Sequence, residues 1–366
     1  MEDTLERIQS VIISASTKAR GSSIAFRRQR NPTRPAASWI TTSRIGNSTG
    51  KALSVVFSTI GCSHARGESG GCTMCSYLLD GTSVPPSAAE LVEQFAAAMS
   101  KLDDEEAPLS VKLYTSGSFL DSEEFPSEAM KSVLETIAQD PRITQVVVES
   151  RPDYVTESNV SLLRSILGYR HIEIGIGLES MNERVRMLCV NKGFSSDDFE
   201  QALLTAKQQN IGVRAYVLIK PPFMTERDAI LDSVLTVRQS AALWASTVSV
   251  NPVNIQRHTL VEQLWTDGLY RPPWLWTVVE VLKRGHSEIP QETNLVCDPV
   301  AAGKARGAHN CGRCDQAVIR AIRDFSLDQD PKSLEGLDCE CKTDWEHVLA
   351  HEDVSLYVHS DRHEGR

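Results

Sequence analysis

Three cysteines lie close together in the stretch GCSHARGESGGCTMCSY, residues 61–77. Their spacing is Cys-x9-Cys-x2-Cys, at Cys62, Cys72 and Cys75. A structural zinc site uses four ligands and a disulfide framework needs an even number of cysteines, so three thiolates fit neither. Three thiolates on a cubane iron–sulfur cluster leave one iron without a protein ligand. Three buried free cysteines, or a zinc site completed by His64, are the alternatives.

An iron with an open position can bind a small molecule through its amino and carboxylate groups. The chemistry that requires such an iron is the reductive cleavage of S-adenosylmethionine, in which one electron breaks the sulfonium bond and a 5′-deoxyadenosyl radical forms. The loop also contains the small residues needed to wrap around a cluster, namely Gly61, Gly67, Gly70 and Gly71. The three cysteines are therefore predicted to hold a [4Fe–4S] cluster.

A second group of cysteines lies in the last quarter of the chain, at Cys297, Cys311, Cys314, Cys339 and Cys341. Cys311-Gly312-Arg313-Cys314 has the spacing of a knuckle whose two thiolates bind one metal ion. Cys297 and either Cys339 or Cys341 are expected to complete a tetrahedral zinc site, with His309 as a spare ligand. A second iron–sulfur cluster is the alternative, because four thiolates suit either metal.

The composition is that of an ordinary soluble globular protein, with 41% hydrophobic and 23% charged residues among 366. No run of about 18 apolar residues exists, so no membrane span is expected. The N-terminal stretch carries acids and lacks a long apolar segment, which argues against a secretory signal and for a cytoplasmic protein. In that setting nine cysteines, an odd number, favour metal ligation over disulfides. Cys189, alone on a predicted helix, is expected in the core.

Positive charge is concentrated at the N-terminus, although the protein as a whole has a net charge of −10. Residues 1–51 carry nine lysines and arginines and three acids, a net charge of +6, so the remainder carries −16. The spacing of Leu5, Ile8, Val11 and Ile12 predicts a short amphipathic helix. The basic stretch that follows, residues 25–35, is suited to lie along nucleic-acid phosphates. Its candidate contacts are Arg27, Arg28, Arg30 and Arg34; the alternative is a solvated leader.

Short β-branched runs alternate with helical patterns from about residue 53 onwards. Strands are predicted at 53–60, 110–115, 144–150, 172–178, 212–219 and 246–252. Helices are predicted between them at 86–102, 126–139, 156–167, 181–189, 196–209 and 225–240. Six strand–helix units imply a parallel sheet, and the absence of Gly-x-Gly-x-x-Gly after the first strand disfavours a dinucleotide-binding fold. The predicted fold is α/β, a partial (β/α)6 TIM-type barrel with its site at the carboxyl ends of the strands.

Polar clusters follow the predicted strands, where the site of such a barrel lies. After the cysteine loop they are Ser116-Gly117-Ser118, Glu149-Ser150-Arg151-Pro152, Glu179-Ser180, Lys220-Pro221-Pro222 and Asn251-Pro252-Val253-Asn254. Beyond Pro272-Pro273 the strand–helix rhythm weakens. Three regions are thus predicted: an N-terminal helix and basic arm (1–51), the partial barrel (52–270), and a small cysteine-rich, metal-binding module (271–366) that suits, with the arm, a macromolecular substrate.

The cysteine spacing resembles the radical SAM superfamily, in the wide-spaced form of the elongator catalytic-subunit family; most members separate the first two cysteines by three residues. The run Glu149-Ser150-Arg151-Pro152-Asp153 resembles the same group. More closely, GCTMCSY with its preceding long loop, the stretch 35–39, and CDPVAAGKARGAHNCGRCD (297–315) together resemble the archaeosine synthase beta subunit family. This resemblance extends from about residue 35 to residue 342.

The resemblance implies a set of contacts to S-adenosylmethionine: Met74, Ser116, Gly117, Ser118, Glu149, Arg151, Glu179, Ser180, Arg214 and Asn251. Met74 would pack near the adenine. Residues 116–118 would replace the family's glycine-rich motif that hydrogen-bonds the methionine amine, with serines at some of its glycine or acidic positions. The remaining side groups are candidates for the ribose and the carboxylate. For each, the alternative is that a polar residue at a strand end only satisfies neighbouring loops.

The resemblance also implies the last step of archaeosine formation, at a 7-deazaguanine base in the D-loop of archaeal tRNA. A partner transferase, the alpha subunit, first joins lysine to the nitrile of 7-cyano-7-deazaguanine. The radical enzyme then takes hydrogen from the lysine-derived part, and elimination breaks the C–N bond of the lysine side chain and leaves an amidine, a lyase reaction. The implied partners are tRNA, the alpha subunit and an electron donor, with no membrane.

Chemistry on a tRNA base requires that the base leave its stack, so the bulk of the tRNA would lie on the arm and the C-terminal module. Two other functions are compatible with the same residues. One is a different elongator-like radical SAM enzyme acting on tRNA or protein, which the absence of an obvious acetyl-CoA-binding domain disfavours. The other is a non-catalytic, metal-bearing subunit that binds tRNA.

Overall fold

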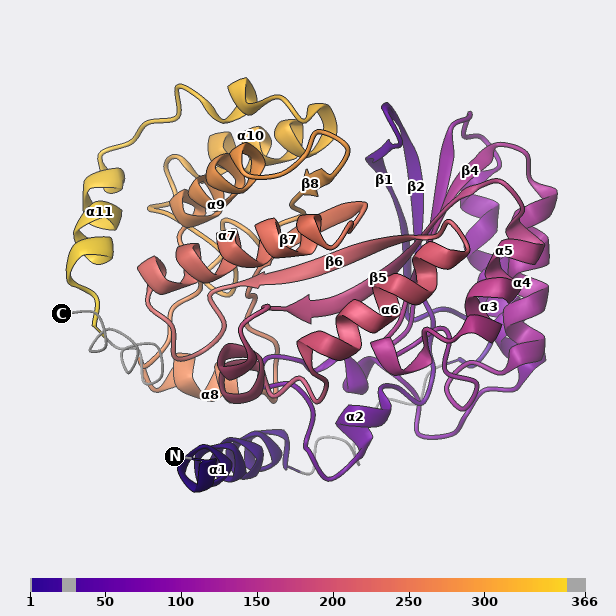
Figure 1. The fold of residues 1–366 in the computed structure, drawn as a ribbon, viewed down its shortest axis with the longest axis horizontal. Coiled ribbons are helices and arrows are strands. Elements are labelled where there is room, and N and C mark those ends of the chain that lie inside the picture. The colour runs from indigo at the N-terminus through magenta and orange to yellow at the C-terminus, as the bar shows by residue number, and fades with distance from the viewer. Residues whose placement is uncertain (1, 22–30, 354–366) are drawn as a thin grey trace.

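A computed structural model describes residues 2–21 and 31–353. Its centre is one eight-stranded sheet in sequential order: β1 (Ala37–Ile45), β2 (Ser48–Val56), β3 (Leu109–Tyr114), β4 (Ile143–Glu149), β5 (His171–Glu179), β6 (Gly212–Ile219), β7 (Thr247–Pro252) and β8 (Asn294–Val296). β1 is antiparallel to β2 and every later neighbour is parallel. The sheet curls into an open half-barrel (Figure 1), so the predicted partial barrel is confirmed.

Helices cover the outer face of this sheet, as parallel strands require. They are α3 (Ala88–Met99), α4 (Ser127–Gln139), α5 (Glu157–Leu167), α6 (Ser196–Gln208), α7 (Glu226–Ala242) and, packed on α7, α9 (Leu275–Ser287). The predicted start of α3 is confirmed, because Ser87 and Glu90 form a reciprocal capping box. The other helices are α1 (Glu2–Arg20), the short α2 (Ser63–Arg66), α8 (Leu260–Thr266), α10 (Asp315–Asp328), α11 (Cys341–His351) and the π-helix η5 (Val185–Val190). None of the helices in the described ranges is long and apolar enough to cross a membrane.

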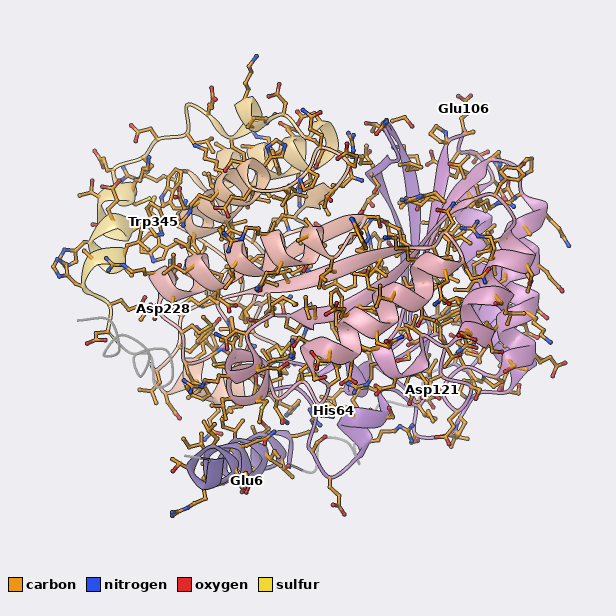
Figure 2. The ribbon with its side chains drawn as sticks, in the orientation of Figure 1. Glu6, His64, Glu106, Asp121, Asp228 and Trp345 are labelled. Carbon is orange, nitrogen blue, oxygen red and sulfur yellow. The ribbon has the colours of Figure 1, made fainter. Side chains whose placement is uncertain are left out.

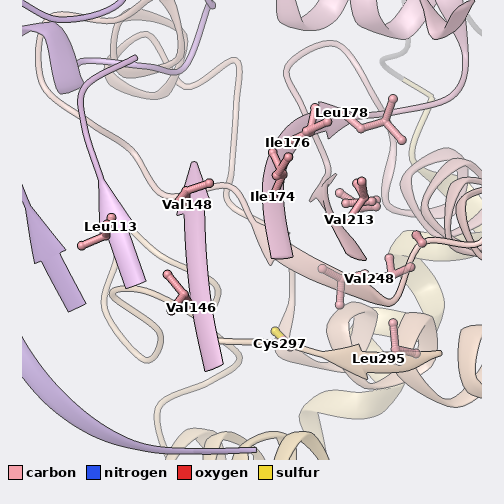
Figure 3. Close-up of a cluster of buried hydrophobic side chains, with 14 of the residues drawn as sticks. Leu113, Val146, Val148, Ile174, Ile176, Leu178, Val213, Val248, Leu295 and Cys297 are labelled. Atoms are coloured by element: carbon pink, nitrogen blue, oxygen red, sulfur yellow. The ribbon is translucent and has the colours of Figure 1, made fainter. Parts of the chain in front are cut away.

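The two faces of the sheet differ in chemistry because side chains alternate along each strand. On the outer face Val146 and Val148 of β4, Ile174 and Ile176 of β5 and Val213 of β6 pack in the main hydrophobic core (Figure 3). The intervening residues line the inner face, and many are polar: Lys112, Tyr114, Glu149, Glu173, Arg214 and Tyr216. The inner face of the half-barrel is therefore built for polar ligands.

Two strands lie outside the six that the sequence patterns predict. β1 pairs with β2 along nine residues through the two-residue turn at Gly46-Asn47, where Gly46 has a φ of +57°. Gly-Asn between two β-branched runs is a hairpin signal that was present in the sequence. At the other edge, β8 extends the sheet beside β7. The sheet thus continues across both predicted region boundaries, at residues 51/52 and 270/271.

The predicted N-terminal amphipathic helix is α1, and its apolar side packs against the half-barrel. Ile12 is 3% exposed and contacts Leu188 and Leu260, with Leu5 and Ile8 packed beside it. Val11, which the predicted apolar stripe included, is 67% exposed, because it is one residue, about 100° of helix, away from Ile12. In the basic stretch, Arg27, Arg28 and Arg30 lie outside the described residues. Arg34 is exposed in a turn that precedes β1.

Candidate functional site

The three N-terminal cysteines lie on the loop that follows β2, at the carboxyl ends of the strands, and residues 61–77 are called here the cluster loop. All three cysteines are partly buried. Burial raises the pKa of Cys72, and it raises the pKa of Cys75 to about 12 with a further contribution from the neighbouring Cys72. Thiols held neutral in this way become thiolates when a metal binds them.

His64 does not complete a zinc site with these cysteines. Its Nε2 lies 2.7 Å from the carbonyl oxygen of Asn191 and its Nδ1 lies 2.9 Å from Ser69 Oγ, so both ring nitrogens already have partners. Burial lowers the pKa of this imidazole to about 4, which keeps the ring neutral. His64 belongs to α2, and in Figure 2 it lies on the side of the molecule where α1 is found. The histidine alternative to an iron–sulfur cluster is therefore disfavoured.

Asn191, directly after the π-helix, fastens the cluster loop from outside. It is 2% exposed and adopts a left-handed conformation, φ +57°, which asparagine tolerates better than most residues. Its Nδ2 donates to the carbonyl oxygens of Ser69 (2.8 Å) and Gly71 (2.9 Å). The sequence patterns did not predict this role, because the hydrogen bonds join positions about 120 residues apart.

Helix α1 holds the same loop through Arg20. The buried guanidinium donates to the carbonyl oxygens of Ala65 (3.2 Å) and Cys75 (3.3 Å). Position 71 requires glycine, because its φ is +71° and a Cβ would lie 2.9 Å from Ala65 and 3.0 Å from Arg20 Nη2. The cluster loop is thus positioned by two elements, α1 and the residues after the π-helix, that sequence reasoning did not connect with it.

Residues 116–118 pack directly against the start of the cluster loop. A Cβ on Gly117 would lie 2.5 Å from Cys62 Cα and 2.2 Å from Glu124 Oε2, so only glycine fits. Glu124 joins the two loops, because its carboxylate accepts from Thr59 Oγ1 (2.6 Å) and from the Ser118 amide (2.7 Å). Ser116 Oγ is buried without a hydrogen-bond partner among the described residues, which leaves it as a group for a ligand to satisfy.

The polar residues after β4 and β5 meet at the segment 191–193. Arg151 donates to the carbonyl oxygens of Lys192 (3.2 Å) and Gly193 (3.0 Å), which holds this segment in place. Lys192 in turn forms an ion pair with Glu179, 2.7 Å between Nζ and Oε1. Burial raises the pKa of nearby Glu149 to about 8, with Lys192 opposing and Glu179 adding to the rise. Glu179 and Lys192 thus offer charged groups at the mouth of the half-barrel, and Glu149 offers a carboxyl group that is mostly protonated at neutral pH.

Three further predicted cofactor contacts occupy different levels of the half-barrel. Met74 is partly buried and packs against an apolar group that includes Leu218 and Tyr270. Asn251, at the end of β7, is half-buried, and its Nδ2 donates to the Ser249 carbonyl oxygen (3.2 Å). Arg214 lies deeper on the inner face, where Glu173 Oε2 accepts from its Nη2 (2.7 Å) and its Nε (3.2 Å).

The C-terminal cysteines converge on one point. The ligand atoms of Cys311, Cys314, Cys339 and Cys341 all lie within 4.8 Å of one another, and these four are called here the rear cysteine group. Trp276 Nε1 and Asn310 Nδ2 donate to two of the sulfurs, at 3.4 and 3.3 Å. Backbone N–H groups of the knuckle lower the pKa of Cys311 to about 6. Four convergent thiols with N–H donors around them suit a tetrahedral metal ion.

Cys297 is not a member of this group, which corrects the favoured ligand set. It is 3% exposed and packs in the main hydrophobic core beside the end of β8 (Figure 3). The structure brings both Cys339 and Cys341 to the knuckle instead, because Cys341 is the first residue of α11 and the turn before it carries Cys339. Cys189 is fully buried, as predicted.

Comparisons with known proteins identify the family to which the chain belongs. No protein-family model matches it. The archaeosine synthase subunit beta of Methanosarcina acetivorans is 44% identical over 325 residues, which cover 88% of this chain and 91% of that protein. The chain belongs to the archaeosine synthase subunit beta family. A second family member, from Thermococcus kodakarensis, is 36% identical over 313 residues, 85% of this chain and 95% of that protein.

Among solved structures, Elp3 from the archaeon Methanocaldococcus infernus resembles this family member with a TM-score of 0.46 and 16% identity, over 60% of this chain and 55% of that one. The family resemblance that the sequence motifs indicated is thus confirmed by the curated relatives, which match along nearly the whole length.

Two predicted cofactor contacts of this family member have partners within the protein instead. Ser180 Oγ donates to Asp232 Oδ1 on α7 (2.8 Å) and accepts from the Asn182 amide (3.0 Å), so it faces the helix layer. Ser118 Oγ accepts from the Arg151 amide (3.0 Å). Both hydroxyls join strand-end loops to neighbouring elements, which is the alternative that sequence analysis left open for them.

The burial of Asp232 makes the stability of the apoprotein depend on pH, and the hydrogen bond from Ser180 opposes this effect in part. Burial raises the pKa of Asp232 from 3.8 to about 7. Between these values the unfolded state binds fewer protons, so the free energy of unfolding falls as pH rises from about 4 to 7. Asp232→Asn, which resembles the protonated form, is expected to gain on the order of 2–4 kcal/mol over the wild type between pH 5 and pH 8.

Thermal or urea unfolding of both apoproteins at the two pH values measures this difference. Asp324→Asn, at an exposed position on α10, is the control and is expected to leave the pH dependence unchanged. Parallel behaviour of Asp232→Asn and wild type across this range would contradict the assignment.

Asn191→Ala is expected to shorten the lifetime of the bound cluster. The substitution leaves the carbonyl oxygens of Ser69 and Gly71 without their donor and places alanine at a positive φ, a loss of about 2–4 kcal/mol of loop stability. The measurement is the rate at which the cluster's visible absorbance decays in the presence of a chelator, expected to rise at least several-fold. Asn210→Ala is the matched control, because Asn210 also has a positive φ, +52°, but is exposed. Equal decay rates for both variants would show that Asn191 does not hold the loop.

Proposed function

We propose that this chain is a radical SAM enzyme of archaeosine biosynthesis. Its reaction is cleavage of the C–N bond of the lysine side chain in the lysine adduct of 7-cyano-7-deazaguanine in the D-loop of tRNA, which leaves the amidine of archaeosine. The observation that carries the proposal is the cluster loop: three partly buried cysteines at the carboxyl ends of the parallel strands, of which Cys72 and Cys75 have desolvated thiols, in a member of the archaeosine synthase subunit beta family.

Cys62, Cys72 and Cys75 would hold a [4Fe–4S] cluster, which supplies the electron that splits S-adenosylmethionine into methionine and a 5′-deoxyadenosyl radical. The thiol chemistry fits that cluster, and the glycines at positive φ in the loop, Gly61, Gly70 and Gly71, give the backbone room to surround it. Arg20 and Asn191 keep the loop in position. The partnerless hydroxyl of Ser116 offers a hydrogen bond to the bound nucleotide.

Charged groups at the mouth divide into two roles. Arg151 positions the segment 191–193 through its carbonyl oxygens. The Glu179–Lys192 pair then presents a carboxylate and an ammonium side by side, which matches the amino and carboxylate ends of a methionine moiety. Gly177 leaves room for this pair, because a Cβ there would lie 2.5 Å from Lys192 Nζ and 2.8 Å from Glu179 Oε1. Glu149 and Asn251 stand on either side as further contacts.

The rear cysteine group would hold zinc and fasten the C-terminal segment to the barrel. With the basic residues of the N-terminal arm, of which Arg34 is exposed, this segment would carry the bulk of the tRNA while one base enters the half-barrel. The expected partners are tRNA, the archaeosine synthase alpha subunit that attaches the lysine, and a protein that donates electrons. The place of action is expected to be the cytoplasm.

The experiment is an anaerobic incubation of reconstituted protein with S-adenosylmethionine, dithionite and tRNA that carries the lysine adduct. Mass spectrometry of the nucleosides is expected to show conversion of the adduct to archaeosine, with 5′-deoxyadenosine formed in parallel. 5′-Deoxyadenosine without archaeosine would indicate a different radical SAM substrate. Neither product, in protein with a full cluster, would indicate a tRNA-binding subunit without catalytic activity.

A further inference from the structure

The inner face of the half-barrel carries charges well below the cluster loop, and the proposed chemistry at the mouth does not use them. Lys112 precedes Tyr114, the last residue of β3, by two positions, so it lies about 7 Å deeper along the strand. Lys112 is only half-buried, yet burial lowers its pKa to about 8, with Arg214 adding to the fall. Lys112 therefore lies on the inner face of the curled sheet, where it is partly accessible to solvent.

Two cationic groups on this surface have unused hydrogen-bonding capacity. Lys112 Nζ donates to Ser43 Oγ of β1 (3.1 Å) and forms no ion pair with a described residue. Arg214 uses Nη2 and Nε for Glu173, and its Nη1 makes no hydrogen bond within the described ranges. Glu173 is saturated, because Ser246 and Thr247 hydroxyls also donate to it. Arg214 is therefore rigidly held, and its Nη1 remains available to a ligand on the inner face.

The loop after β8, at the far edge of the sheet, brings a carboxylate into the electrostatic environment of Lys112. Asp298 follows β8 by two residues, and its negative charge partly opposes the lowering of the pKa of Lys112. It is exposed, and its carboxylate makes no hydrogen bond to any residue that the structure describes. The phenols of Tyr114 and Tyr216 belong to the same inner face, and Tyr216 Oη is buried without a partner of good geometry among the described residues.

Glycine keeps the space between these groups open. Gly175 and Gly177 occupy inner-face positions of β5, beside Arg214 and Tyr216 in the pairing register. A Cβ on Gly175 would lie 2.9 Å from the Tyr216 ring. A longer side group at either position would fill the region between the mouth and Lys112.

We propose that Lys112, Arg214 and Asp298 form a binding site for the α-amino and α-carboxylate groups of an amino acid, with Lys112 and Arg214 on the carboxylate and Asp298 on the ammonium. The inference rests on the proposed function, because the ligand is the head group of the lysine in the tRNA adduct. The four methylenes of lysine span the distance from this depth to the mouth, which leaves the C–N bond level with the cluster loop. The site makes the enzyme specific for adducts that carry a complete amino acid.

The test compares three substrates and two variants. D-arm oligonucleotides are synthesised with the adduct of 7-cyano-7-deazaguanine and lysine, 1,5-diaminopentane (no carboxylate) or 6-aminohexanoate (no α-amine). The wild type is expected to prefer the lysine adduct over the diaminopentane adduct by about 10- to 100-fold in kcat/KM, because the missing carboxylate leaves the desolvated charge of Lys112 unpaired. Its preference over the aminohexanoate adduct is expected to be smaller, about 3- to 5-fold, because Asp298 is exposed to solvent. Lys112→Met is expected to lose the preference over diaminopentane, and Asp298→Asn the preference over aminohexanoate.

Controls separate this site from the rest of the enzyme. Lys101→Met and Asp104→Asn, both at exposed positions, are expected to keep the wild-type preferences. Iron content and cleavage of S-adenosylmethionine without substrate are expected to be unchanged in Lys112→Met and Asp298→Asn, and Lys112→Arg is expected to recover part of the selectivity. Should Lys112→Met be unstable, Asp298→Asn at its exposed position still decides the question.

The outcomes distinguish the two hypotheses. Conversion of the lysine adduct by a wild type with no preference, or by variants whose preferences are unchanged, would overturn the head-group site and leave the proposed function standing. Cleavage of S-adenosylmethionine without conversion of any adduct would overturn the proposed function, and the head-group site with it.

Discussion

Protein in which Cys62, Cys72 and Cys75 are all changed to alanine is expected to contain no iron–sulfur chromophore and to form no 5′-deoxyadenosine. The three thiols are the described cysteines on the cluster loop, and the raised pKa values of Cys72 and Cys75 mean that only a bound metal keeps those two ionised. The expected loss of S-adenosylmethionine cleavage is complete, at least about 10³-fold, because no remaining residue replaces the electron source. Visible absorbance, iron content and 5′-deoxyadenosine after anaerobic reconstitution measure it.

Cys189→Ala is the matched control for this triple variant. Cys189 contacts the cluster loop through its backbone, where its carbonyl oxygen accepts from Thr73 Oγ1 (2.6 Å), and its thiol is fully buried. Alanine keeps that hydrogen bond, so colour and activity are expected to stay near wild type. A triple variant that still forms the chromophore, or a control that loses it, would show that the cluster is held elsewhere.

Cys314→Ser is expected to lower both the content of tightly bound metal and the stability of the protein. The rear cysteine group joins the knuckle at 311–314 to the turn before α11, and structural metal sites contribute binding free energy directly to folding. Loss of one buried thiolate is expected to cost several kcal/mol and to lower the unfolding midpoint by roughly 10 °C. Elemental analysis and thermal unfolding, each with and without a chelator, measure the two effects.

Cys297→Ala is the control that separates the two possible ligand sets. Because Cys297 packs in the hydrophobic core away from the rear cysteine group, its replacement is expected to lower stability modestly and to leave metal content unchanged. Equal metal loss in Cys297→Ala and Cys314→Ser would favour the set that the sequence spacing suggested. Elemental analysis also identifies the metal as zinc or iron.

The family and the architecture could be read from local patterns. Short β-branched runs located six of the seven parallel strands, β2 to β7, and a capping box at Ser87 and Glu90 located the start of α3. These signals survive because strand and helix periodicity are properties of neighbouring residues. The hairpin of β1 and β2 had such a signal at Gly46-Asn47 too, but the excess of positive charge over residues 1–51 led to the prediction of a basic arm there.

The assignment of roles to individual polar residues could not be read in the same way. Ser180 and Ser118 stand at strand ends, as a cofactor contact would, but their hydroxyls bind Asp232 and the Arg151 amide. The hydrogen-bond partner of a hydroxyl at a strand end depends on how an element some 30 to 50 residues later in the chain packs. Motif spacing in the sequence does not contain that information. Asn191 and Arg20 act on the cluster loop from similarly distant positions.

The sequence alone provided the basis of the proposed chemistry, since three cysteines at this short spacing predict a cluster with an open iron. Only the tertiary structure decided which thiols form the rear cysteine group and what lies beneath the cluster loop. The physical reason is the separation along the chain between the residues that come into contact. A motif within one loop is set by the local backbone geometry, whereas the convergence of Cys314 with Cys341 exists only after the last helix has packed against the barrel.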